Sequence, residues 1–398
     1  MRAVLLPSLA AGLTTASQGV LELAYPLRQH ELGDPLTLVG VAFALLGVGA
    51  LLSRLPAGAW YRAEQAGLQI AASLVVFALT TVGIGFADVW AVQAALAVVH
   101  GFAFGLVTTF LLALLVDSQP SRTNAAPSIA WFTAALTTGY GLGSLLGART
   151  IEIFSIQAAF VVSGGAGLVA VPLAARFRPA RRAETKPAAI TGHAGLRALG
   201  QVSSGVWLAC LLGLYINFTK DAYDTFFPIY AVSIGISVSA VGVFRTLSSA
   251  GSAAIRFAAV GLLRLVPVGV VNHAGVLLMA LSALVLSATT HEPLLAAAFV
   301  VLGTTRALLR VTSATAVAEE RERSAGARNV GMASAVYNAG LDAGSMLGPP
   351  AAGALAGAFD IPTSFRVVAL ALPALYYVIW LSQRRYLPSP LKTGLEKT

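Results

Sequence analysis

Four carboxylates stand inside apolar stretches of this sequence, and three of them could couple to protons. Glu22 lies in the first such stretch, and Asp221 and Asp224 lie in the seventh. A carboxyl group in apolar surroundings can take up and release a proton near neutral pH, because its charged form has lost its hydration. We therefore predict that Glu22, Asp221 and Asp224 couple the function of the protein to protons.

Lys220 offers a simpler explanation for part of this pattern. It stands four residues before Asp224, at the spacing of an ion pair on one face of a helix. Such a pair would neutralise Asp224 and leave it without a role in proton coupling. Both interpretations remain open on the sequence alone.

Basic and polar side chains in similar stretches indicate contact with a substrate or a gate. Arg306 and Arg310 are one helical turn apart, and a planar guanidinium group suits a carboxylate or phosphate; the alternative is that they pair with Asp342. Arg245 should pair with a carboxylate, because an unpaired buried arginine is costly. His100 either carries protons or packs structurally. The residues predicted for substrate binding or a gate are Gln18, His100, Asn217, Lys220, Arg245, Arg306, Arg310 and Asp342.

Two further arginines, Arg54 and Arg256, fall near the predicted cytoplasmic ends of their helices. Long basic side chains at such positions commonly extend to the membrane interface. We expect them to extend in this way or to anchor contacts of an inner gate, in preference to binding substrate.

The composition shows which elements must hold these residues. Of 398 residues 57% are hydrophobic and only 11% are charged, whereas soluble domains carry roughly 25% charged residues. A mean hydropathy of +0.78 excludes a soluble or disordered chain. The net charge of +9 does not indicate nucleic acid, because most basic residues lie in short loops between apolar runs. A single cysteine, Cys210, permits no internal disulfide.

The apolar runs are long enough for twelve membrane-spanning helices, each needing about 20 residues. The sequence predicts them at residues 4–27, 36–60, 67–87, 90–116, 127–148, 153–174, 205–231, 237–261, 266–289, 292–317, 328–356 and 362–383.

The loop charges predict that both termini are cytoplasmic, in the inner membrane of a cell. The loops assigned to the outside hold only Arg28, Arg149 and Arg366. The inside segments hold Arg2, Arg62, Arg122, Arg176, Arg178, Arg181, Arg182, Lys186, Arg197, Arg264, Arg321, Arg323, Arg328, Arg384, Arg385, Lys392 and Lys397. The one long polar connection predicts a cytoplasmic linker at 176–200 between a six-helix unit at 1–175 and a second at 201–398 with a short tail.

The two units repeat each other. At an offset of 202 residues the sequence aligns Pro26 with Pro228, Gly33 with Gly235, Arg54 with Arg256 and Arg62 with Arg264 without a gap, and Glu22 with Asp224. At an offset of 201, Gly139, Gly143 and Gly147 align with Gly340, Gly344 and Gly348. Parallel six-helix repeats related by an axis along the membrane normal are a known transporter plan.

Several degenerate motifs make the chain resemble the major facilitator superfamily. The segment Arg54-Leu-Pro-Ala-Gly58-Ala-Trp-Tyr-Arg62-Ala-Glu-Gln-Ala-Gly67 is similar to the Gly-x-x-x-Asp-Arg-x-Gly-Arg-Arg signature of that family, but lacks its acidic residue. Gly139-Tyr-Gly-Leu-Gly143-Ser-Leu-Leu-Gly147 is similar to the antiporter signature of the fifth helix. The helix-4 arginine of many proton antiporters is absent near Ala97.

The resemblance implies an all-α membrane protein of twelve transmembrane helices in two pseudo-symmetric six-helix bundles. It also implies that helices 1, 4, 7 and 10 line a central cavity, that 2, 5, 8 and 11 flank it, and that 3, 6, 9 and 12 face lipid. The charges agree with this arrangement, since the last four carry none well inside their spans.

We therefore expect a secondary active transporter of a small organic molecule. The sequence lacks the motifs of ATP binding, of metal-dependent hydrolases and of serine hydrolases, so we expect neither an enzyme nor a cofactor. Proton-coupled efflux is favoured by the glycine signatures. The alternatives are proton-coupled uptake of an organic anion or zwitterion, and a non-transporting receptor on the same fold. The expected partners are the substrate, protons and membrane lipids, with no nucleic acid, and the protein is expected to be a monomer.

Overall fold

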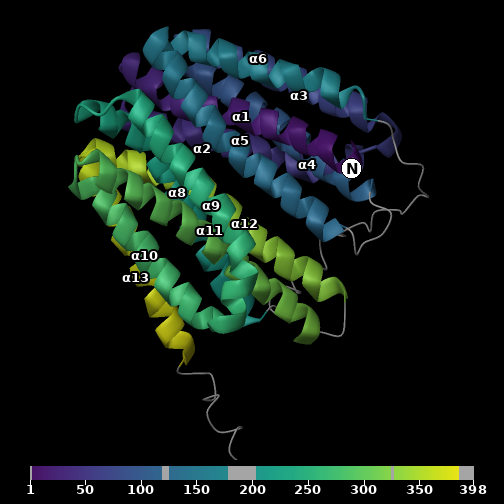
Figure 1. Cartoon of the computed structure of the whole chain (residues 1–398). Coiled ribbons are helices and arrows are strands. Elements are labelled where there is room, and N and C mark those ends of the chain that lie inside the picture. The colour runs from purple at the N-terminus through teal and green to yellow at the C-terminus, as the bar shows by residue number, and fades with distance from the viewer. Residues whose placement is uncertain (1, 119–124, 178–202, 324–326, 385–398) are drawn as a thin grey trace, which may run out of the picture.

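Long helices make up the described part of the chain, and no strand occurs in it. The structure is a computed structural model that describes residues 2–118, 125–177, 203–323 and 327–384. A short 3-10 helix, η1 (Ala63–Gln65), precedes α3. The twelve long helices in this part (Figure 1) are α1 (Arg2–Glu31), α2 (Leu36–Trp60), α3 (Ala66–Phe86), α4 (Trp90–Asp117), α5 (Ala125–Ile153), α6 (Ile156–Ala174), α8 (Ser204–Ser233), α9 (Val238–Leu265), α10 (Val268–Ala288), α11 (Glu292–Arg323), α12 (Ala327–Ala358) and α13 (Ile361–Arg384).

These helices confirm the twelve predicted spans in order and nearly in extent. One difference lies at the connection between α5 and α6, where α5 continues to Ile153 and only Phe154 and Ser155 separate it from α6. Ser155 caps α6 by accepting a hydrogen bond from the backbone of Ala158. The predicted linker at 176–200 lies almost wholly outside the described residues, as do Arg122, Arg385, Lys392 and Lys397.

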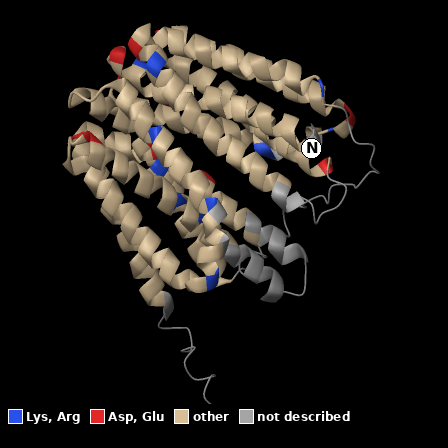
Figure 2. Cartoon of the chain, in the orientation of Figure 1, with Lys and Arg blue, Asp and Glu red and all other residues tan. Residues whose placement is uncertain are grey.

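The length and apolarity of the helices show a multi-pass membrane protein. Within the described residues, ten helices are long and apolar enough to cross a membrane. The helix α8 is not among them, because its centre carries Lys220, Asp221 and Asp224. Figure 2 shows that charged residues gather at the helix ends and along the contact between the two halves of the molecule.

The first six and last six helices form two bundles with the same internal packing. In the first bundle α1 packs on α5, α2 on α4, and α3 on α6; in the second bundle α8 packs on α12, α9 on α11, and α10 on α13. The repeat also extends to the turn after the first helix of each bundle. Gly33 and Gly235 both have a φ of 82°, a conformation that glycine adopts without strain. The sequence repeat is therefore a structural repeat.

Two seams join the bundles, one between α2 and α12 and one between α5 and α9. We call the end of the molecule with the turns at 61–65 and 266–267 the linker end, and the end with the turns at 32–35 and 234–237 the far end. Both seams are tight toward the far end, where Gly40 lies against Pro349 and Gly242 lies against Ser144. Figure 1 shows the bundles meeting at one end and diverging toward the end where the chain begins.

The third, sixth, ninth and twelfth helices, which were predicted to face lipid, are α3, α6, α10 and α13, and they lie on the outside of the molecule. α3, α6, α10 and α13 take no part in the two seams. Their exposed side chains are large and apolar, as at Leu68, Leu79, Val169, Leu281 and Val378. Such surfaces match the hydrocarbon of a bilayer.

Gly40→Ala is expected to open the far end. An added Cβ would lie 2.3 Å from the carbonyl oxygen of Pro349 across the α2–α12 seam, so the bundles must separate there. Overpacking of this kind costs roughly 1–3 kcal/mol, and each 1.4 kcal/mol changes a population ratio about tenfold. Spin labels at Glu31 and Phe359, which are exposed on opposite bundles, should report longer distances in this variant.

Gly165→Ala is the matched control, because nothing lies within 4 Å of its added Cβ. An unchanged distance distribution in Gly40→Ala would show that this contact does not hold the far end closed.

Candidate functional site

Five ionisable side chains form an ion cluster where α1 meets α8 and α9. Lys220 Nζ lies 2.6 Å from Asp221 Oδ1, 3.1 Å from Asp224 Oδ2 and 3.8 Å from Glu22 Oε2. Arg245 Nη2 lies 3.4 Å from Glu22 Oε2, and Arg245 Nε lies 3.7 Å from Asp224 Oδ1. The cluster therefore joins the two bundles by ion pairs.

The ion cluster is buried and holds one more acid than base. The side chains of Arg245 and Glu22 are only 7% and 11% exposed. Buried charges are costly unless they are paired, so their balance matters. Three carboxylates face two cations in these ion pairs, and Arg306 of α11 also attracts Asp224 and Asp221 from farther away. A proton gained or lost here would therefore change how the buried charges balance.

The contacts of Lys220 bear on both interpretations drawn from the sequence. It does pair with Asp224, but it also contacts Asp221 and Glu22, and it lies 6.0 Å from the ring centroid of Tyr140 in α5. A cation shared among three acids does not neutralise one of them alone. The pairing expected for Arg245 is present with Glu22 and Asp224.

Gln18 and His100 extend the ion cluster into the first bundle. Gln18 Nε2 donates to Glu22 Oε1 at 3.3 Å, and Gln18 Oε1 lies 2.8 Å from His100 Nε2. His100 is fully buried and its Nδ1 lies 3.2 Å from the hydroxyl of Thr81. It lines neither of the two cavities described below, so its position supports the orientation of Gln18 more directly than contact with a substrate.

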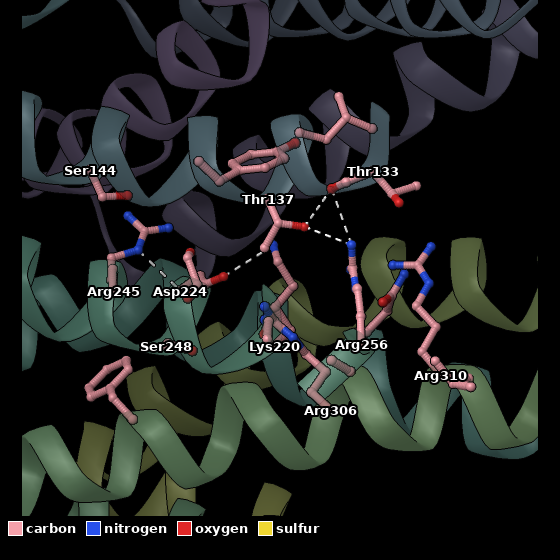
Figure 3. A pocket seen from close by; sticks show the side chains of 18 of the residues that line it. Thr133, Thr137, Ser144, Lys220, Asp224, Arg245, Ser248, Arg256, Arg306 and Arg310 are labelled. Atoms are coloured by element: carbon pink, nitrogen blue, oxygen red, sulfur yellow. Dashed lines mark hydrogen bonds and ion pairs between the residues drawn. The ribbon is translucent and has the colours of Figure 1, made fainter. Parts of the chain in front are cut away.

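A cavity of about 690 Å³ lies beside the ion cluster (Figure 3). Glu22 and Asp224 stand at one part of it, and the lining continues along α5, α9 and α11 to Ile129 and Ala314 near the linker end. Its lining residues are Glu22, Ile129, Thr133, Leu136, Thr137, Tyr140, Ser144, Asn217, Lys220, Asp224, Arg245, Ser248, Ser249, Ser252, Arg256, Phe299, Arg306, Ala307, Arg310, Val311 and Ala314.

A second cavity, of about 260 Å³, lies on the other side of Lys220. Gln18, Asp221 and Asp342 line it, and Asn217, Lys220 and Arg310 line both cavities. Of the residues predicted for the site, the structure thus brings all except His100 to one of these two cavities.

The helices around the cavities differ from the implied set. Gly101 and Phe104 of α4 line the smaller cavity, but no residue of α4 lines the larger one. Instead α5 and α9, the fifth and eighth helices, form much of the lining of the larger cavity, although both were expected only to flank the centre. The reason is that the seam between α5 and α9 is tight only toward the far end, so their linker-end halves face the space between the bundles.

Asp342 pairs with a residue that the sequence did not suggest. Arg54 Nη1 lies 2.6 Å from Asp342 Oδ1, across the α2–α12 seam. The suggested pairing of Asp342 with Arg306 or Arg310 is therefore wrong, because the carboxylate faces α2 of the other bundle.

Arg256 also reaches across a seam. Its Nη1 donates to the carbonyl oxygen of Thr133 at 3.2 Å and to Thr137 Oγ1 at 2.8 Å in α5. Arg54 and Arg256 thus both anchor contacts between the bundles, and Arg256 also lines the larger cavity. The repeat at offset 202 is the signal in the sequence that pairs these two arginines.

Comparison with known proteins identifies the family. The sequence model of the Major Facilitator Superfamily matches residues 8–327, so the chain belongs to that family. It is a transporter by family, and its architecture is the twelve-helix fold of that superfamily. None of the curated proteins matches the chain.

Solved transporters share the fold at low sequence identity. A bacterial homologue of the human lysosomal transporter Spinster, in an inward-facing and unoccupied conformation, is 14% identical with a TM-score of 0.77, and the match covers 98% of each chain. The nucleoside transporter NupG is 12% identical with a TM-score of 0.75, and the match covers 98% of this chain and 100% of that one.

Arg245→Met is expected to destabilise the protein strongly. It leaves Glu22 and Asp224 with only Lys220 as a cation, and breaking a buried pair costs about 3–5 kcal/mol. Adding Glu22→Gln should restore most of the loss, because the ion cluster then again holds one more carboxylate than cations, as in the native protein. Thermal unfolding in detergent measures both variants.

Arg149→Met serves as the control, since Arg149 pairs with Glu152 at 3.7 Å and its side chain is 60% exposed. If Arg245→Met unfolds no more easily than this control, the ion cluster does not contribute the stability assigned to it.

Proposed function

We propose that this member of the Major Facilitator Superfamily is a proton-coupled secondary transporter of a small organic molecule. The observation that carries the proposal is the ion cluster, which joins the two bundles beside the larger cavity and holds one acid more than base. Glu22, Asp221 and Asp224 are the proposed proton-coupling residues, and the cavity is the proposed substrate site.

Protonation of Glu22 explains how a proton could control the contact between the bundles. Glu22 is the only member of the ion cluster on the first bundle, so its pairs with Lys220 and Arg245 hold the bundles together. A proton on Glu22 removes the attraction. The residues left on the second bundle are then two acids and two bases, and the bundles can part without exposing an unpaired charge.

The seams support alternating access as the mode of transport. The bundles are tightly joined toward the far end, and the larger cavity extends toward the linker end. Rocking of one bundle against the other would close the linker end and open the far end. Arg54 and Arg256 lie on the linker-end parts of the seams, where such closure would change their contacts. Because one chain holds both bundles and the whole cavity lining, we propose a monomer.

We propose that the direction is efflux across the inner membrane, with the linker end and both termini in the cytoplasm. The antiporter-like glycine signature of α5 and the glycines that align with it in α12 favour efflux, and the basic loops favour this orientation. The second candidate is proton-coupled uptake of an organic anion, favoured by the arginines of the larger cavity. A substrate gradient imposed on proteoliposomes separates the two, because antiport moves protons against the substrate flux and symport moves them with it.

Asp224→Asn is expected to abolish transport driven by a pH gradient while ligand binding stays within a few-fold of the native value. The amide cannot exchange a proton, but it preserves the shape of the cavity. The ligand comes from a stability screen of the purified protein against metabolites and drugs, because a ligand that binds only the folded state raises the unfolding temperature. Uphill transport and binding are then measured on proteoliposomes.

Glu22→Gln should behave in the same way, and Glu31→Gln is the control on the same helix, since Glu31 pairs with Arg28 at the far end, away from the ion cluster. Full uphill transport by Asp224→Asn would remove Asp224 from the coupling role. Absence of any substrate-dependent flux in the native protein would favour the receptor interpretation.

The orientation can be tested with single cysteines in a Cys210→Ala background. Arg62→Cys marks the linker end and Asp88→Cys marks the far end, and both positions are exposed. A membrane-impermeant maleimide should label only Asp88→Cys on intact cells and should label Arg62→Cys after permeabilisation. The reverse pattern would place the termini outside.

A further inference from the structure

We propose that the larger cavity binds an organic oxyanion, a phosphate or carboxylate with an apolar body, whose charged group lies among Arg256, Arg306 and Arg310. This inference rests on the proposed function, because it assigns a substrate class to the same cavity. We call the three residues the arginine wall.

The arginine wall has no carboxylate partner within the described residues. Arg54, Lys220 and Arg245 all form ion pairs with acids. Arg306 and Arg310 form none there, and Arg256 donates only to neutral oxygens of Thr133 and Thr137. Figure 3 shows Arg256 and Arg310 on the side of the cavity away from Arg245, with Arg306 nearer to Lys220. Asp224 and Asp221 attract Arg306 from beyond ion-pair distance, so the surplus positive charge of the wall lies at Arg256 and Arg310.

The repeat shows what the arginine wall lacks. Arg54 and Arg256 occupy equivalent positions, and each reaches across a seam to the opposite bundle. Arg54 meets Asp342 there, but the residue equivalent to Asp342 at offset 201 is Gly141. The seam of Arg256 thus has no counterpart of the carboxylate that Arg54 meets. This difference adds to the surplus charge of Arg310 beside it.

The guanidinium groups are accessible from the cavity. Arg256 and Arg306 are half-buried and Arg310 is exposed, and all three line the same space. Like charges held close together within a membrane domain are unfavourable, and an anion would relieve their repulsion. Guanidinium forks bind carboxylate and phosphate oxygens in pairs, which gives both affinity and orientation.

The rest of the cavity suits an apolar body. Leu136 and Tyr140 of α5 face Phe299 and Val311 of α11 around the same space. A volume of about 690 Å³ falls in the range of sites for small organic ligands, roughly 300–1,000 Å³. Inorganic ions alone would leave this apolar lining without a partner.

A ligand bound at the arginine wall would also reach the contact between the bundles. Arg256 holds α5 through Thr133 and Thr137, so an anion that engages its guanidinium group competes with those hydrogen bonds. Binding would thus weaken the α5–α9 seam at the linker-end part of the molecule. This places the proposed ligand where it can influence rocking.

Four probes with one ring system test the charge preference. They are 1-naphthyl phosphate, 1-naphthoate, 1-naphthol and 1-naphthylmethylammonium, with inorganic phosphate and succinate as head groups alone. The unfolding temperature of the purified full-length protein is followed against the concentration of each. The two naphthyl anions should raise it saturably, whereas the alcohol and the ammonium probe should not. The ratio of their dissociation constants shows whether phosphate or carboxylate is preferred.

Arg306→Gln/Arg310→Gln should raise the dissociation constant of the preferred anion about tenfold or more, because charge-assisted hydrogen bonds are lost. Arg306→Lys/Arg310→Lys keeps the charge without the fork and should fall between. Arg366→Gln removes one arginine charge at the far end, outside the linings of both cavities, where Nη2 donates to the carbonyl oxygen of Ser287, and this variant should bind as the native protein does. The unfolding temperature without ligand shows that each variant is folded.

Three results would overturn the inference: no shift with any anion, an equal shift with the alcohol or ammonium probe, or undiminished anion binding by Arg306→Gln/Arg310→Gln. These outcomes are separable from failure of the proposed function. Anion binding without any transport would contradict the transporter mechanism alone, and pH-driven transport of a non-anionic ligand would contradict this inference alone.

Discussion

Charge balance in a low-dielectric interior is the constraint on which this molecule depends. An unpaired ion between two membrane bundles is costly, so buried charges there are stable only when partners balance them. The ion cluster meets this condition in two ways. With Glu22 ionised, its pairs to Lys220 and Arg245 join the bundles; with Glu22 neutral, the remaining charges balance within the second bundle. The position of one carboxylate on the first bundle makes this possible.

The repeat supplies the scaffold for that cluster, and its departures from symmetry supply the site. Glu22 and Asp224 occupy equivalent positions, but only the second bundle adds Lys220 and Asp221 beside them. The equivalent packing of α1 on α5 and of α8 on α12 brings the two positions to the same depth from opposite sides. A symmetric scaffold thus carries an asymmetric set of charges, as directional coupling requires.

Much of the fold could be predicted because it depends on patterns that run along the sequence. The span at 36–60 coincides with α2, and the offset of 202 residues identifies the turns at Gly33 and Gly235 that share one backbone conformation. The same offset aligns Glu22 with Asp224, so the sequence also indicated that carboxylates of the two bundles occupy equivalent positions. What the sequence could not supply is which face of a helix meets which neighbour across a seam.

Asp342 shows this limit. The sequence offered Arg306 or Arg310 as its partner, whereas its carboxylate pairs with Arg54 of the other bundle. The role of Arg256 beside the larger cavity was missed for a similar reason, because its acceptors, Thr133 and Thr137, are neutral and lie on a helix of the other bundle. His100 was predicted as a contact for substrate or a gate, and this stays a prediction; its neighbours in the structure are Gln18 and Thr81.

The two seams differ in the kind of force that holds their linker-end parts. Arg54 and Asp342 attract each other as opposite charges, and the arginine side chain is 51% exposed. Dissolved salt therefore screens their attraction, with a Debye length of about 8 Å at physiological ionic strength. Arg256 is held by neutral oxygens, on which such screening has much less effect. Raising the ionic strength therefore weakens the linker-end contact of α2 with α12 more than that of α5 with α9.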